Sequence, residues 1–261
     1  MKSSIIRTWL IFGIIVLLST QCITTGEPFT GIPPGIWRGV LYLEEGNFRP
    51  DIAGTFDEQS KAEFPFKFEA VYDTPDSFHI EIISGSQRTI VNNIHFGLDR
   101  ATGKDTLEMT FSPGKSIIRA FYEEDAIEGN WVLLDREDYK VPFRAVYSKD
   151  YLFTELHKEP VLDITGRWNV RLSVESDSPI DAIGEFTLDG NHLLASFSTP
   201  AETYRHLEGT VQGDRLFLSS FDGVQALLFE AKILSDGTLS GIFRNGIHEK
   251  TYWAAKPVSV D

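Results

Sequence analysis

Cysteine is almost absent from this sequence: Cys22 is the single cysteine among 261 residues. No disulfide can therefore form within the chain, and no Cys-x-x-Cys pair is present for thiol–disulfide exchange. Because Cys22 precedes the part of the chain that is patterned to fold, catalysis by a cysteine nucleophile is excluded for the folded body.

Positive charge is also scarce. The chain holds 24 Lys and Arg against 38 Asp and Glu, which gives a formal charge of −14 at pH 7. Such a surface repels phosphates and anionic headgroups, so no binding to nucleic acid is expected. The simpler interpretation is that this charge keeps the protein soluble. With 42% hydrophobic and 12% aromatic residues, the chain has ample material for a core.

Long hydrophobic runs are confined to the N-terminus. Lys2 and Arg7 accompany an apolar run from Trp9 to Leu18. A run of about ten residues is shorter than the roughly 20 that a membrane span needs. It fits the hydrophobic region of an export signal.

The only cysteine follows this run directly. The segment Leu18-Ser19-Thr20-Gln21-Cys22 resembles the signal of bacterial lipoproteins, which implies that Cys22 is lipidated and becomes the mature N-terminus. The segment departs from that pattern in two ways. Leu18 lies four residues before the cysteine instead of three, and Gln21 is bulky where a small residue is usual.

Two other interpretations of residues 1–22 remain open, namely an uncleaved anchor from Ile5 to Ile23 and ordinary cleavage near Thr20. All three place the body of the protein outside the cytoplasm. The expected location is the cell envelope, as a periplasmic or outer-membrane lipoprotein attached to the membrane by the lipid at Cys22. Residues 23–34 contain two Gly and three Pro and are expected to be a flexible tether.

An internal repeat organises the rest of the chain. The stretch 35–43 begins Gly-Ile-Trp and parallels the stretch 166–174, which begins Gly-Arg-Trp, so that Trp37 and Trp168 lie 131 positions apart. Each unit closes on a segment of aromatic residues and Ala, at 141–145 and 251–255. We expect a first unit over 35–148, a linker over 149–162 and a second unit over 163–258.

Within each unit the hydrophobic pattern has a period of two. Trp168, Val170, Leu172 and Val174 alternate with polar residues, which predicts a strand with one buried face. Asp-Gly steps such as Asp222-Gly223 suit tight turns between strands. No stretch has the pattern of an amphipathic helix of useful length.

About eight such strands are expected in each unit. Closing an antiparallel meander into a barrel removes exposed strand edges. The expected fold is therefore all-β, with two tandem antiparallel meander β-barrels of lipocalin-like or avidin-like type. A β-sandwich is the alternative, because a period of two does not separate the two architectures. Trp37, Trp131, Trp168 and Trp253 are expected to be buried plugs.

The second unit also carries a family resemblance. The runs 197–209 and 211–223 together with 228–231 and 236–241 resemble the N-terminal accessory region that precedes the thioredoxin domain of TlpA-like thioredoxin-family lipoproteins. The first unit fits through Gly35-Ile36-Trp37 and 141–145, so the resemblance covers nearly all of 35–256. It implies an envelope setting and a thioredoxin-family protein as partner.

Two departures limit what the resemblance implies. The thioredoxin domain with its Cys-x-x-Cys pair is not in this sequence, so no reductase activity is implied. Val224-Gln225-Ala226 stands where the family has Ala-His-Ala, so any role of that histidine does not carry over.

Few residues suggest chemistry. The six histidines are scattered, and none is paired with another at a metal-ligand spacing. No Gly-x-Ser-x-Gly elbow is present. We therefore assign no catalytic residue, no metal ligand and no cofactor.

The best candidate site is a polar cluster in the second unit, expected to converge at one barrel mouth. There Arg205 and His206 would recognise an anionic or carbonyl group of a small ligand. The alternative is that these residues only cap hairpins. The candidate ligand-binding residues are Tyr204, Arg205, His206, Ser219, Asp222 and His248.

The function expected from the sequence is that of a non-enzymatic envelope lipoprotein whose tandem β modules mediate binding or assembly, with a thioredoxin-family protein as partner. The alternative is a small-ligand carrier that uses a barrel-mouth pocket. A hydrolase-type enzyme built on the polar cluster is the third hypothesis. A carrier requires an open pocket with convergent polar groups, whereas an enzyme requires neighbouring titratable groups with shifted pKa values.

Overall fold

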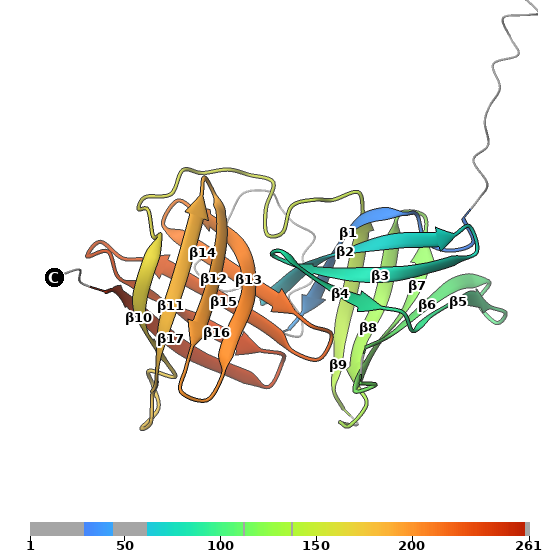
Figure 1. Ribbon diagram of the computed structural model, residues 1–261. Coiled ribbons are helices and arrows are strands. Elements are labelled where there is room, and N and C mark those ends of the chain that lie inside the picture. Colours follow the sequence, from blue (N-terminus) through green and yellow to red (C-terminus); the bar gives the residue numbers. More distant parts are fainter. Residues whose placement is uncertain (1–28, 44–61, 112, 137, 259–261) are drawn as a thin grey trace, which may run out of the picture.

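A computed structural model describes residues 29–43, 62–111, 113–136 and 138–258 of the chain. The described residues form 17 strands and no helix, in two units that lie side by side (Figure 1). The expected signal and Cys22 lie outside the described residues. Among the residues described, no helix is long and apolar enough to cross a membrane.

The second unit is a closed barrel of eight antiparallel strands in sequence order. The last strand pairs with the first, so that Leu172 faces Trp253 across the closure. The strands are β10 (Gly166–Leu172), β11 (Ile180–Asp189), β12 (His192–Ser198), β13 (Thr203–Gln212), β14 (Arg215–Phe221), β15 (Ala226–Ile233), β16 (Leu239–Asn245) and β17 (Glu249–Pro257).

The first unit is a curled antiparallel sheet of nine strands that does not close. Its spatial order is β4-β3-β2-β1-β9-β8-β7-β6-β5, which leaves β4 and β5 as edges. The strands are β1 (Gly35–Tyr42), β2 (Glu63–Thr74), β3 (Ser77–Ser84), β4 (Gln87–Val91), β5 (Ile94–Asp99), β6 (Lys104–Phe111), β7 (Ser116–Glu123), β8 (Ala126–Leu133) and β9 (Lys140–Tyr147).

The predicted all-β fold of tandem barrel-like units is thus confirmed, with one difference. The first unit has nine strands and an opening where eight strands and closure were expected. Only Asn92 and Asn93 separate β4 from β5, and the carbonyl of Asn93 accepts the N–H of Thr110 at 2.9 Å. The chain therefore turns directly onto β6 instead of pairing back onto β4.

The alternation predicted for β10 is seen. Trp168, Val170 and Leu172 are buried and the residues between them are exposed. Val174, expected in the same buried row, lies beyond the end of β10 and is 40% exposed. Leu228, which alternates with a buried row in β15, is itself buried because the first unit covers that side of the strand.

The four tryptophans expected as plugs are all buried. Trp37 Nε1 donates to the carbonyl of Pro33 at 3.1 Å, and Trp168 Nε1 donates to the carbonyl of Ile164 at 2.9 Å. Both acceptors lie four residues before the tryptophan. The repeated sequence therefore produces the same anchoring contact in both units.

The end of the expected tether is part of the fold and not flexible. Ile32 is fully buried, and its carbonyl accepts a hydrogen bond from the hydroxyl of Tyr72 at 2.9 Å. The prediction of a flexible tether over 23–34 is therefore wrong for residues 29–34, because the side chain of Ile32 packs in the core of the first unit.

The linker 149–162 is held against both units along one side of the molecule (Figure 1). Arg38 of β1 donates from Nε to the carbonyl of Leu152 at 2.7 Å. The N–H of Lys158 donates to Oε1 of Gln212 in β13 at 2.8 Å. The linker therefore acts as a strap that touches each unit.

The two units interlock through the turn between β14 and β15. The ring of Phe221 lies in the core of the first unit, 4.4 Å from Phe66 and 5.5 Å from Trp131 between ring centroids. The carbonyl of Gly223 accepts hydrogen bonds from Trp131 Nε1 at 3.0 Å and from the hydroxyl of Ser116. The barrel thus supplies part of the core of the open sheet.

Candidate functional site

A β-bulge in β13 positions the two basic residues of the predicted cluster. Pairing between β12 and β13 shifts register after Tyr204, which faces Phe197, so that Arg205 and His206 together lie opposite a single residue. Tyr204 and Leu207 on either side both point into the barrel: Tyr204 packs on Phe229, with ring centroids 6.1 Å apart, and Leu207 is fully buried. The extra residue therefore places Arg205 and His206 on the outer face of the barrel together.

The bulge requires an unusual backbone conformation. His206 has φ +56°, in the left-handed region that non-glycine residues adopt at a cost of about 1–2 kcal/mol. Strain of this kind is retained where the surrounding structure enforces it, here through the register shift between β12 and β13. A one-for-one register would turn one of the two basic side chains into the barrel core.

The turn between β14 and β15 forms a second side of the site. Asp222 accepts on Oδ1 the N–H groups of Val224 at 2.8 Å and of Gln225 at 2.7 Å. These bonds fix the carboxylate and leave its second oxygen unused by the turn. The same turn carries Phe221 into the first unit, so the site and the interlock share one structural element.

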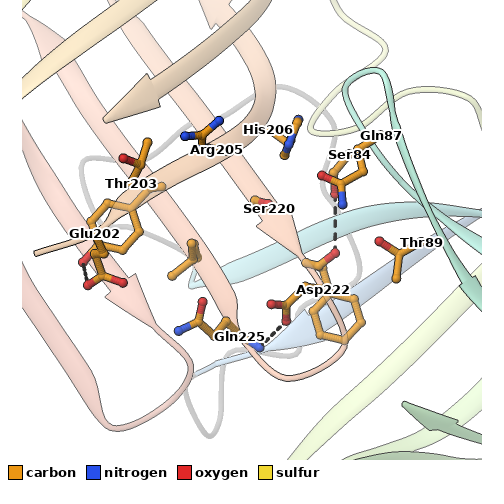
Figure 2. A pocket seen from close by; sticks show the side chains of 13 residues that line it. Ser84, Gln87, Thr89, Glu202, Thr203, Arg205, His206, Ser220, Asp222 and Gln225 are labelled. Atoms are coloured by element: carbon orange, nitrogen blue, oxygen red, sulfur yellow. Dashed lines mark hydrogen bonds between the residues drawn. The ribbon is translucent and has the colours of Figure 1, made fainter. Parts of the chain in front are cut away.

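The first unit supplies the third side. Ser84, Gln87 and Thr89 come from the hairpin of β3 and β4 and face the barrel (Figure 2). Two hydrogen bonds hold this hairpin in place. The N–H of Gly85 donates to Oε2 of Glu208 at 2.9 Å, and the hydroxyl of Ser84 donates to the carbonyl of Phe221 at 3.4 Å.

These three sides enclose a pocket of about 200 Å³ at the rim of the barrel, where the two units meet. In Figure 2, Arg205 and His206 lie along one side, Asp222 and Gln225 along the other, and Glu202 at one end beside Thr203. The full lining is Ser84, Gln87, Thr89, Glu202, Thr203, Tyr204, Arg205, His206, Ser220, Phe221, Asp222, Gln225 and Leu227.

Tyr204 is held in its neutral form. Burial raises the pKa of its phenol well above the ordinary value, and the hydrogen bond from its hydroxyl to Oε1 of Glu202, at 2.8 Å, raises the pKa further. At neutral pH the group therefore donates a hydrogen bond and does not act as a base.

Four of the six predicted ligand-binding residues line this pocket: Tyr204, Arg205, His206 and Asp222. The other two lie elsewhere in the contact between the units. Ser219 is buried and donates from Oγ to the carbonyl of Pro65 at 2.8 Å. His248 packs edge-on against the ring of Tyr139, with ring centroids 5.1 Å apart.

Sequence reasoning missed the first-unit wall of the pocket. Ser84, Gln87 and Thr89 lie more than 100 residues before the β13 cluster, and no spacing in the sequence links the two segments. Their contribution depends on how the units dock. The described part of the chain contains no group of His, Cys, Asp and Glu that could hold a metal ion.

The interior of the barrel is packed with aromatic rings. Phe197 lies 4.8 Å from Phe229 and 5.6 Å from Trp253 between ring centroids, and all three side chains are fully buried. The pocket therefore lies at the rim of the barrel, on the side of the first unit, and these rings fill the interior below it.

Comparison with known proteins gives only distant structural neighbours. No family model matches the chain, and no curated protein matches it. A protein of unknown function from Nostoc punctiforme PCC 73102, of the DUF3598 family, is 14% identical over 85% of this chain and 94% of its own length, with a TM-score of 0.26.

A second neighbour comes from Bacteroides fragilis NCTC 9343 and is described as a "putative outer membrane protein". It is 10% identical over 85% of this chain and 95% of its own length, with a TM-score of 0.24. Similarity at this level carries no information on the function of this chain.

Proposed function

We propose that this chain is a non-enzymatic binding protein of the cell envelope, tethered to the membrane through a lipid on Cys22, that holds a small polar ligand between its two β units. The observation that carries the proposal is the bulge of β13. It turns Arg205 and His206 together into a pocket that both units build.

Both basic side chains are available to a ligand. Arg205 and His206 are exposed, and neither side chain forms a hydrogen bond or ion pair with another described residue. Elsewhere on the barrel, exposed arginines are engaged: Arg171 donates to Asp181 at 3.0 Å. A guanidinium presents several donors in a fixed geometry that suits a carboxylate or carbonyl group.

The size of the pocket limits the ligand. Sites for drug-sized ligands usually enclose about 300–1,000 Å³, whereas this pocket encloses about 200 Å³. A small metabolite or the end group of a longer molecule fits that space. Hydroxyl and amide groups from Thr89, Ser220 and Gln225 supply both donors and acceptors along its wall.

The same geometry favours binding over catalysis. Tyr204 is kept neutral, and Oδ1 of Asp222 is already occupied by two N–H groups of its own turn. A neutral phenol does not take a proton from a substrate, and the bonds to Oδ1 hold the Asp222 carboxylate in a fixed orientation. The pocket therefore supports recognition of polar groups by fixed hydrogen bonds.

A ligand screen with matched variants tests the proposal. The full mature chain is titrated with a panel of small polar metabolites and followed by amide NMR shifts. We expect at least one metabolite to shift the amide resonances of residues around the pocket. Arg205→Ala should weaken the binding of that metabolite at least tenfold. Arg167→Ala, on the outer face of β10 beside Glu185, is the control and should leave affinity unchanged. Equal binding by both variants, or no pocket shift with any metabolite at millimolar concentration, would refute the proposal.

A further inference from the structure

The pocket carries charges of both signs on opposite sides. Arg205 and His206 lie along one side of it, Asp222 lies on the opposite side, and Glu202 lies at one end beside Thr203 (Figure 2). With His206 neutral, the four side chains sum to a formal charge of −1, from one Arg against one Glu and one Asp. The whole chain has a formal charge of −14. A simple anion therefore meets net repulsion at this pocket despite Arg205.

A simple cation is disfavoured for a different reason. It would pair with Glu202 or Asp222 but would add a positive charge to the pocket that holds Arg205, and like charges repel. A ligand with one positive and one negative group satisfies both sides. The charges in the pocket are free to do this, because none of the four side chains is in an ion pair with another described residue.

The carboxylates retain acceptor capacity for a ligand. Tyr204 donates to Oε1 of Glu202, and the turn N–H groups donate to Oδ1 of Asp222, so the second oxygen of each carboxylate stays available. An ionised carboxyl group has about four lone-pair sites. A ligand ammonium with three N–H donors matches acceptors of this kind.

From this arrangement we infer that the ligand is a small zwitterion of the α-amino acid class, with its carboxylate on Arg205 and His206 and its ammonium on the carboxylate side chains that line the pocket, Glu202 first among them. This inference rests on the proposed function and names the chemistry of its ligand. The volume of about 200 Å³ restricts the side chain to a small one. The hydroxyl and amide groups of Thr89 and Ser220 and of Gln87 favour a polar one.

Three probes that share a hydroxymethyl group test this inference on the full mature chain. Serine carries both charged groups, 3-hydroxypropionate lacks the ammonium, and ethanolamine lacks the carboxylate. We expect serine to bind at least tenfold more tightly than either analogue in NMR or calorimetric titrations. Equal or tighter binding of 3-hydroxypropionate or of ethanolamine would overturn the inference.

Two variants assign the charged groups. Arg205→Gln should weaken serine binding at least tenfold but should not weaken ethanolamine binding, because ethanolamine has no carboxylate and the variant removes a like charge from the pocket. Glu202→Gln should weaken serine binding but should not weaken 3-hydroxypropionate binding, because the variant removes a negative charge that repels an anion. Glu185→Gln, on the outer face of β11, is the matched control and should change nothing. A Glu202→Gln variant that binds serine as tightly as the unaltered chain would contradict the assignment of the ammonium.

The outcomes separate this inference from the proposed function. Pocket shifts with glucose but with none of the three probes would make this a saccharide site, which refutes the zwitterion and leaves a binding protein. Shifts with 3-hydroxypropionate alone would make it an anion site, with the same consequence. An absence of pocket shifts with any of the four compounds and with the wider metabolite panel would refute both.

Discussion

The two units of this protein begin with the same motif and complete their cores differently. Each anchors its first tryptophan to a carbonyl four residues earlier, at Pro33 in one unit and at Ile164 in the other. The second unit then closes its sheet, and β17 pairs with β10. The first leaves β4 and β5 unpaired to each other and takes a turn of the second unit into its core.

This difference shows how an open barrel is stabilised next to a closed one. Closure satisfies every strand edge and seals the core within one unit. The open sheet instead packs Phe64, Phe66, Phe111 and Trp131 around the ring of Phe221 from its neighbour. We therefore expect the barrel to fold independently and the open sheet to depend on it.

Phe221→Ala is expected to cause the largest loss of stability. Removing a fully buried aromatic ring from a core costs about 3–5 kcal/mol, and here the cavity opens in the first unit. Denaturant unfolding followed by the fluorescence of tryptophans should show the environment of Trp131 lost before that of Trp253. Loss of both together would show that the barrel depends on the open sheet as much as the reverse.

Gly223→Ala should destabilise the interlock by roughly 3 kcal/mol, from left-handed backbone strain and overpacking combined. Gly223 has φ +92°, and an added Cβ would overlap the ring of Phe111. Gly190→Ala is the matched control, since Gly190 has φ +58° but open space around its Cβ. Thermal unfolding should separate the two variants, and equal melting temperatures would mean that the contact with Phe111 contributes nothing.

The contact between the two units could not be predicted from the sequence. The Asp222-Gly223 step predicted a turn, and a turn is there between β14 and β15. Where Phe221 goes depends on contacts with Phe66 and Trp131, which lie far away along the chain and share no periodic signal with it. In the same way, Leu228 alternates with a buried row, yet the first unit buries it.

The candidate site was likewise predicted only in part from the sequence. Tyr204, Arg205, His206 and Asp222 came from local patterns at strand ends, and they meet in one pocket. Ser219 and Ser220 are neighbours on β14 and could not be told apart by sequence. Because side chains alternate along a strand, one faces Pro65 and the other lines the pocket.

Substitutions at Ser219 and Ser220 are expected to have a smaller effect on stability, which tests the contact between the units. Ser219→Ala should cost about 2 kcal/mol, because the buried carbonyl of Pro65 loses its donor from the barrel. Ser220→Ala removes a hydroxyl from a pocket wall that is open to water and should change stability little. Chemical denaturation of both variants measures the difference. A cost for Ser220→Ala as large as that for Ser219→Ala would contradict this placement.

The smallest stability effect concerns the bulge in the barrel. Replacing His206 by Gly relieves the left-handed strain and should leave stability equal or raise it by about 0.5 kcal/mol, after the entropic cost of glycine. His206→Val should lower stability by roughly 1–2 kcal/mol, because a β-branched residue resists φ +56°. Thermal melts of the two variants check the sign of each change. A stable Val variant would mean that His206 does not hold the conformation described.

The most direct test of the asymmetry between the units is to produce each unit alone. Residues 163–258 and residues 29–148 are expressed separately, and their amide NMR spectra and denaturant unfolding curves are recorded. The barrel fragment should give well-dispersed amide resonances and unfold cooperatively. The open-sheet fragment should give poorly dispersed resonances and no cooperative unfolding transition. An open-sheet fragment that unfolds as cooperatively as the barrel would contradict the claim that Phe221 and its turn complete the core of the first unit.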